Sequence, residues 1–132
     1  NIVLFACIGV GVFRATGSAL ALAAGFLAAV LHIGYDVIAY RELRIQGGGG
    51  EIIKVRWHLT GSSDMKTRLA KGQRDPLATV HTIGRRDFFI LAFLVYALLG
   101  LPWLALVHAL LIAGPLAVVA GAQVVWRLRG GR

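Results

Sequence analysis

The sequence has few cysteines, few acidic residues and little charge outside one central block. Six Asp and Glu residues stand against fourteen Lys and Arg, which gives a formal net charge of +8 in 132 residues. The single Cys7 excludes a disulfide framework within the chain and a cysteine metal cluster. Hydrophobic residues make up 58% of the chain, whereas soluble proteins contain about 45–50% apolar residues even with Gly counted. A soluble domain would have no interior large enough for them, so this composition indicates a membrane protein.

Four apolar runs flank the central block and predict four transmembrane helices. The runs cover residues 2–13, 19–40, 88–99 and 103–126. A hydrocarbon core of about 30 Å needs about 20 helical residues at 1.5 Å each, and the second and fourth runs are long enough. The third can gain a turn or two from residues 79–87. The first starts at Asn1 inside an apolar stretch, so we expect a helix that has lost its beginning.

This pattern predicts an all-α fold, an integral membrane bundle of about four transmembrane helices. We expect one transmembrane domain over residues 1–132, truncated at its N-terminus, with a loop at 41–87. Ten of the fourteen Lys and Arg lie in that loop and three follow the last run. Positive charge favours the cytoplasmic side, so the loop and the C-terminus are predicted to be cytoplasmic, in the plasma (inner) membrane of a prokaryote.

The breaks between the runs contain residues that end or begin helices. Gly17 with Ser18 supplies a turn and an N-cap before residue 19. Gly100 with Pro102 predicts a tight antiparallel hairpin of the last two helices, and Pro115 is expected to kink the final helix. Small residues along 19–29 and 113–122 would allow close helix packing. Trp103 and Trp126 fall where interfacial anchors are expected.

The central block is predicted to contain several short segments. Residues 41–46 should continue the preceding helix out of the membrane with Glu42 and Arg44 exposed, and the glycines at 47–50 should end it. Residues 51–60 alternate apolar and polar side chains, which favours a short strand or extended segment. Residues 60–76 are loop-like in composition, and residues 77–87 should begin the third helix.

Two groups in this block could bind phosphate. Thr60 to Arg68 combines glycine, hydroxyls and two cations, which suits a bound phosphate; alternatively, it is a basic loop that lies on anionic lipid headgroups. Arg85 and Arg86 stand where the third helix enters the bilayer, and either anchor it there or bind phosphate.

One acidic residue and two histidines lie inside the apolar runs. Asp36 either pairs with Arg41, or a basic residue of the loop, or belongs to a functional polar pocket. His32 and His108 are predicted to be hydrogen-bonded inside the bundle and not to bind a metal, and Tyr96 to serve packing.

A resemblance to a known family rests on the residues around the third helix. The string Gly84-Arg85-Arg86-Asp87-Phe88-Phe89, followed by an apolar helix that ends at Leu98-Leu99-Gly100, resembles the C-terminal part of CDP-alcohol phosphotransferases. It is most similar to the branch with the phosphatidylinositol-phosphate-type synthases. The helix that runs out into Arg41 and Arg44, the polar link and the tight hairpin resemble helices four to six of that six-helix fold.

The resemblance implies an enzyme that transfers a substituted phosphate from a CDP-alcohol to an alcohol acceptor, with release of CMP. In that family an Asp-Gly-x-x-Ala-Arg signature with further Asp residues holds Mg²⁺ against the CDP pyrophosphate. No such string occurs in this sequence, so we expect it before Asn1 and expect this chain alone to be inactive. The resemblance leaves Arg41, Lys66, Arg85 and Arg86 as substrate-binding candidates and implies a homodimer in the lipid membrane.

Two other classes of function fit the same residues. One is a small non-enzymatic membrane protein whose basic loop binds anionic lipid or a cytoplasmic partner. The other is part of a transporter, to which Asp36 and Pro115 point. Nucleic-acid binding is not expected, because positive-inside sorting already explains where the cations lie.

Overall fold

The computed structural model describes residues 2–47, 52–60 and 86–130, and this part of the chain is helical. It contains the α helices α1 (Ile2–Thr16), α2 (Ala19–Ile45), α5 (Arg86–Leu98) and α6 (Pro102–Leu128), with the 3-10 turns η1 (Ile52–Lys54) and η2 (His58–Thr60). These residues include no strand. The predicted all-α class is therefore confirmed for the described ranges.

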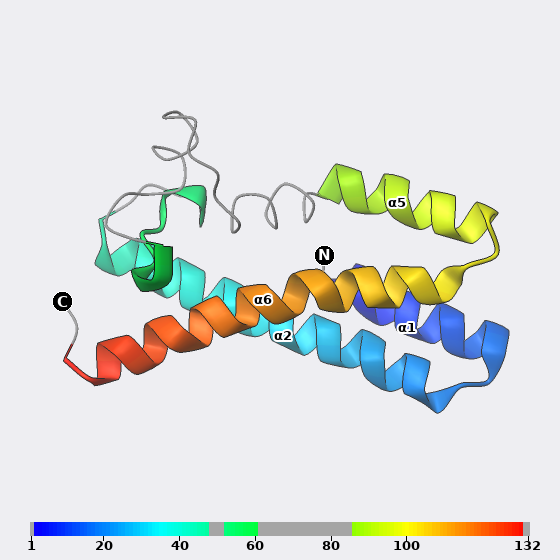
Figure 1. Cartoon of the computed structure of the whole chain (residues 1–132), viewed down its shortest axis with the longest axis horizontal. Coiled ribbons are helices and arrows are strands. Elements are labelled where there is room, and N and C mark those ends of the chain that lie inside the picture. Colours follow the sequence, from blue (N-terminus) through cyan, green and yellow to red (C-terminus); the bar gives the residue numbers. More distant parts are fainter. Residues whose placement is uncertain (1, 48–51, 61–85, 131–132) are drawn as a thin grey trace.

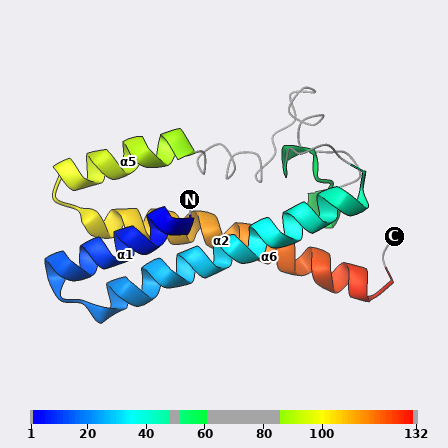
Figure 2. The same ribbon diagram turned by 180° about the vertical axis from the view of Figure 1, so that it is seen from behind.

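The helices form two hairpins that open toward the same end of the bundle (Figures 1 and 2). One hairpin joins α1 to α2 through Gly17, and the other joins α5 to α6 through Gly100. Both glycines adopt the left-handed backbone region, with φ of 70° and 67°, which glycine tolerates at no steric cost. The predicted α5–α6 hairpin is confirmed.

The two long helices, α2 and α6, run in the same direction and pack against each other. Their C-terminal ends therefore meet at the end of the bundle opposite the two turns, an end called here the polar end (Figure 1). The central block leaves α2 at this end, and α6 also ends there. Gly17 and Gly100 thus lie at one end of the described bundle, and the C-terminal ends of α2 and α6 lie at the other. The predicted orientation in a membrane stays a prediction.

Helices α2 and α6 are each long and apolar enough to cross a membrane, whereas α1 and α5 are shorter apolar helices. Helices α2 and α6 have 27 residues each, which corresponds to about 40 Å of helix. Helix α6 begins at Pro102, as predicted, and continues through Pro115 to Leu128. Trp103 and Trp126 lie near its two ends.

Helices α1 and α2 cross at two glycines. A Cβ on Gly25 would lie 2.6 Å from the Cα of Gly9, and a Cβ on Gly9 would lie 2.9 Å from the Cα of Gly25. No other residue type fits such a crossing without moving the backbones apart. Small residues elsewhere in the packed faces are also buried, among them Ala21, Ala28, Ala113 and Ala120. The prediction of close packing through small residues is confirmed.

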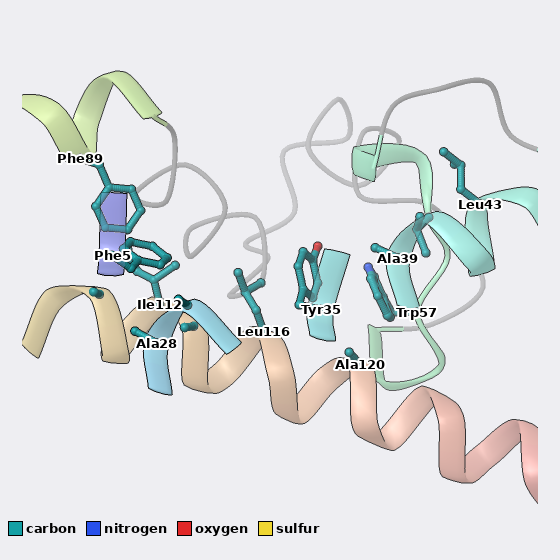
Figure 3. Packing of buried hydrophobic residues seen from close by; sticks show 14 residues of the cluster. Phe5, Ala28, Tyr35, Ala39, Leu43, Trp57, Phe89, Ile112, Leu116 and Ala120 are labelled. Atoms are coloured by element: carbon teal, nitrogen blue, oxygen red, sulfur yellow. The ribbon is translucent and has the colours of Figure 1, made fainter. Parts of the chain in front are cut away.

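Aromatic rings fill the space that the small residues leave (Figure 3). Phe5 of α1 packs edge-on against Phe89 of α5, with ring centroids 5.2 Å apart, and both are fully buried. Phe5 also meets the ring of His32 at 5.3 Å. Phe5 of α1 therefore contacts both α2 and α5.

Two predictions about the central block were wrong. Residues 51–60 do not form a strand: their described part consists of η1, η2 and an irregular link at 55–57. Glu42 is buried, not exposed. The predicted N-cap between α1 and α2 is confirmed in part. Ser18 occupies the N-cap position of α2, but its side chain makes no capping hydrogen bond. The predictions for residues 61–85 lie outside the described residues.

Candidate functional site at the polar end

Glu42 is the centre of a buried hydrogen-bond network where α2 and α6 end together. Its Oε2 accepts hydrogen bonds from Arg127 Nη2 at 3.0 Å, from Gln123 Nε2 at 2.9 Å and from Gln46 Nε2 at 3.2 Å. Its Oε1 accepts one from Arg127 Nε at 3.3 Å. Glu42, Gln46, Gln123 and Arg127 are called here the polar clamp.

The clamp exists because two parallel helices bring residues far apart in sequence to the same level. Glu42 lies 23 residues after the start of α2, and Gln123 lies 21 residues after the start of α6. The Glu42 side chain is 4% exposed and that of Arg127 is 28% exposed. A carboxylate this deeply buried would be costly without such partners.

The electrostatics of Glu42 follow from these contacts. Its side chain lies beyond Tyr40, the last residue of the predicted transmembrane run. Burial raises the pKa of Glu42, but hydrogen bonds from Arg127 and Gln123 and the charge of Arg127 lower it by more, so the pKa lies below its ordinary value. An ionised carboxylate that already accepts four hydrogen bonds is a poor general base near neutral pH. Its role is therefore to hold structure together.

The two glutamines of the clamp connect it to residues 55–58, the segment that follows η1 and ends with the first residue of η2. Gln46 Oε1 accepts a hydrogen bond from the Arg56 N–H at 2.8 Å, and its Nε2 donates to the Arg56 carbonyl at 3.0 Å. Gln123 Oε1 accepts one from the His58 N–H at 2.8 Å. These amides take the positions that a neighbouring strand would occupy, which explains why the alternating pattern does not form a sheet.

Side chains of the same segment insert into the polar end of the bundle. Val55 and Trp57 are buried, and the Trp57 ring stacks on Tyr35 of α2 with centroids 5.6 Å apart (Figure 3). His58 stacks on Trp126 of α6, with centroids 4.5 Å apart and planes 13° apart. Residues 55–58 are thus a wedge between the two helix ends, packed on one side and hydrogen-bonded on the other.

Of the four predicted substrate-binding residues, the structure describes the side chain of Arg41 alone. Arg41 is exposed near the end of α2. Arg86 is the first residue of α5, and its side chain lies outside the description. Lys66 and Arg85 lie outside the described residues, as does the stretch from 61 to Arg68. Whether the four come together therefore stays a prediction.

Polar groups inside the apolar part of the bundle form two pairs. His108 Nδ1 lies 3.2 Å from the Tyr96 hydroxyl, which confirms the predicted hydrogen bond of His108 and adds one to the packing role of Tyr96. His32 Nε2 lies 3.8 Å from Asp36 Oδ2, one helical turn away. The ion pairs among the described residues include none between Asp36 and Arg41. The alternative pairing of Asp36 with a basic residue of the loop stays a prediction where that residue lies at 61–85, outside the described residues.

Metal ligands do not gather in the described ranges. No group of three or more His, Cys, Asp or Glu that could hold a metal ion occurs in residues 2–47, 52–60 and 86–130. The donor set that the Mg²⁺ of the resemblance requires is not found in this part of the chain. Comparisons with protein-family models, with characterised proteins and with solved structures found no match to this sequence.

Sequence reasoning missed the clamp, although one signal for it was present. Gln123 is an amide in the last apolar run, and Glu42 lies two residues after the end of the second run at Tyr40. A polar group in such a helix is costly unless it has a partner. Their similar distances from the starts of two equally long helices would have placed both at the same end of a parallel pair.

Proposed function

We propose that this chain is a membrane-embedded helical bundle and part of a transferase of the CDP-alcohol phosphotransferase type. Such an enzyme moves a substituted phosphate from a CDP-alcohol to the hydroxyl of an acceptor alcohol and releases CMP. The observation that carries the proposal is the common end of α2 and α6, where the basic central block leaves the bundle.

Exposed apolar side chains support placement in a membrane. Large hydrophobic residues more than 60% exposed occur along both long helices, among them Leu20, Val30, Val37, Leu111 and Val118. Soluble monomers rarely expose so much apolar surface. In a bilayer these side chains would contact lipid tails and need no protein partner.

The basic residues near the membrane surface support a phosphate-bearing substrate. Arginine binds phosphate through two parallel hydrogen bonds and keeps its charge at all physiological pH values. In the proposed enzyme, Arg41, Lys66, Arg85 and Arg86 contact the phosphate groups of donor or acceptor from the cytoplasmic side. The proposal requires an Asp-rich signature that would hold Mg²⁺, and the given sequence does not contain this signature.

The test uses the natural gene product that contains this sequence, reconstituted in liposomes with Mg²⁺ and CDP-diacylglycerol as the donor probe. Inositol, inositol phosphate and glycerol phosphate serve as acceptor probes, and released CMP is measured. We expect CMP release that depends on one acceptor. A gene without an Asp-rich signature in the two preceding helices, or no CMP release with any acceptor, would overturn the proposal.

Substrate contacts are tested in the same assay. Arg86→Gln and Lys66→Gln should raise KM for the phosphorylated substrate about tenfold each, because a charge-assisted hydrogen bond is worth about 1.5–3 kcal/mol. Arg14→Gln, at the other end of the bundle, is the matched control and should leave KM unchanged. Equal KM values for all three variants would contradict the assigned contacts.

A further inference from the structure

Charge is distributed unequally between the two ends of the bundle. Among the described residues, the polar end carries the cations Arg41, Arg44, Lys54, Arg56, Arg127 and Arg129, and the end with the two turns carries Arg14. One carboxylate of the polar end, Glu42, is occupied by Arg127. The exposed Arg41, Arg44, Arg56 and Arg129 therefore give the described part of this end an excess of positive charge.

Three of these cations are exposed arginines that come from three different elements. Arg44 lies in the last turn of α2, Arg56 lies in the wedge, and Arg129 is the C-cap residue of α6. All three are exposed. Arg44, Arg56 and Arg129 are called here the arginine surface, and Arg41 is not included because it is a substrate-binding candidate.

The depth of this surface in a bilayer follows from helix lengths. The apolar run of α2 from residue 19 to 40 is about 33 Å long at 1.5 Å per residue, which matches a hydrocarbon core of about 30 Å. Arg44 then lies about one turn beyond the core, at the level of the lipid phosphates. Arg129 follows Trp126, a residue type that favours the same interfacial region.

The polar clamp holds the third arginine, Arg56, at the end of α2, near Arg44. Both backbone hydrogen-bonding groups of Arg56 are bonded to the Gln46 side chain, and Gln46 lies two residues after Arg44. The neighbouring Val55 and Trp57 side chains are buried, so the backbone of Arg56 cannot move freely. Arg56 is therefore held at the end of α2 with its side chain in solvent.

We propose that the arginine surface binds the headgroup phosphates of anionic phospholipids, and that Gln46 acts as a positioning residue for Arg56. Guanidinium groups bind phosphate in a bidentate manner, and basic residues near an anionic membrane surface attract its lipids. This inference rests on the membrane placement in the proposed function and adds a lipid partner that does not take part in the transfer reaction.

Preferential lipid binding can be measured in liposomes by tryptophan quenching with brominated lipids. The full chain is reconstituted with brominated phosphatidylglycerol or brominated phosphatidylcholine, and the ratio of the two binding constants is determined. We expect the ratio to favour phosphatidylglycerol and to fall at high salt. Each arginine is expected to contribute up to about fivefold. Arg44→Gln, Arg56→Gln and Arg129→Gln combined should bring the ratio close to one.

Arg14→Gln is the matched control, since it removes the same charge from the opposite end and should keep the wild-type ratio. The proposed lipid surface would be overturned if the wild-type protein had a ratio near one, or if the triple variant kept the wild-type ratio. In both cases, quenching by both lipids would still support membrane insertion. No quenching by either lipid would instead overturn the membrane placement.

The positioning role of Gln46 has its own readout. Gln46→Leu should lower the lipid ratio as much as Arg56→Gln does, and the double variant should be no lower than either single one. A Gln46→Leu ratio equal to that of the wild type would overturn the positioning role. Helical circular dichroism of each variant separates this local effect from loss of the fold.

Discussion

Glu42 and Arg127 lie 85 residues apart in sequence and form a two-point ion pair, with Nη2 3.0 Å from Oε2 and Nε 3.3 Å from Oε1. The pair joins the C-terminal ends of α2 and α6. Because Glu42 is buried, the loss of either partner would leave a charge with poor solvation. The relative position of the two long helices therefore depends on this contact. The position of the wedge depends on it too, because the wedge is hydrogen-bonded to the clamp.

Removal of the Glu42 carboxylate should destabilise the bundle. We expect Glu42→Ala to lower the free energy of unfolding by about 3 kcal/mol, the range for a broken buried ion pair. Arg127→Ala should cost at least as much, because it leaves the Glu42 carboxylate, which is 4% exposed, without its charged partner, whereas Glu42→Ala leaves Arg127, which is 28% exposed. Denaturant unfolding in detergent micelles measures both. The double variant should lose clearly less than the two single losses added together, whereas simple additivity would show that the two residues act independently.

Acid should weaken the fold through Glu42. Burial raises its pKa, but the hydrogen bonds from Arg127 and Gln123 outweigh burial and keep the pKa below the ordinary value of 4.5. The folded state therefore binds this proton more weakly than the unfolded state does. The resulting stabilisation is complete above the ordinary value and is lost as pH falls through the folded-state pKa. Unfolding free energies measured from about pH 7 down to about pH 3 should show this loss. In the Glu42→Gln variant, the free energy of unfolding should fall less steeply as the pH is lowered. The same pH dependence in the variant and the wild type would assign the effect to other groups.

Local sequence signals predicted the parts of the fold that local physics determines. Long apolar runs gave α2 and α6, and the turn residues Gly17, Gly100 and Pro102 lie where the helices end and begin. The clamp could not be predicted from local sequence signals. Glu42 looked exposed because it is charged and adjoins Arg41, and its burial depends on Gln123 and Arg127, more than 80 residues later.

The prediction of a strand over residues 51–60 was wrong for a related reason. Alternation of apolar and polar side chains over residues 51–60 reports that one side of the segment is buried, and a strand is the usual structure with that property. Here Val55 and Trp57 are buried, so the periodicity was informative. However, the hydrogen-bond partners are the amides of Gln46 and Gln123, which no periodicity in the segment itself can indicate.

Enlargement of Gly25 should separate α1 from α2. A Cβ at this position would meet backbone atoms of Gly9 at 2.6 and 2.9 Å and the Phe5 carbonyl at 2.9 Å. We expect Gly25→Ala to destabilise the protein by about 1–3 kcal/mol, as for other overpacked interiors. Gly34→Ala in the same helix is the matched control, because nothing lies within 4 Å of its Cβ, and it should be neutral or slightly stabilising. Equal effects of the two substitutions would contradict the glycine crossing.

Loss of the Gln123 amide should release the wedge. Gln123→Leu keeps the volume of the side chain but removes the acceptor for the His58 N–H and one donor to Glu42. Limited trypsin digestion, with cleavage after Lys54 and Arg56 quantified by mass spectrometry, should become about tenfold faster, since each lost hydrogen bond is worth about 1 kcal/mol. Val118→Leu, on an exposed position of the same helix, should digest at the wild-type rate. Unchanged cleavage in Gln123→Leu would show that stacking of Trp57 and His58 holds the wedge without the clamp.

The two ends of α2 and α6 should lie on opposite sides of a membrane. Each helix is about 40 Å long, longer than a hydrocarbon core of about 30 Å, so both ends reach water. In a Cys7→Ser background, Ala15→Cys marks the end with the turns and Arg129→Cys marks the polar end, and both positions are exposed. In intact bacterial cells, an impermeant maleimide should label Ala15→Cys, and it should label Arg129→Cys only after permeabilisation, because positive charge favours the cytoplasmic side. The reverse pattern would keep the crossing but invert the orientation, while labelling of both positions in intact cells would show that these helices do not span the bilayer.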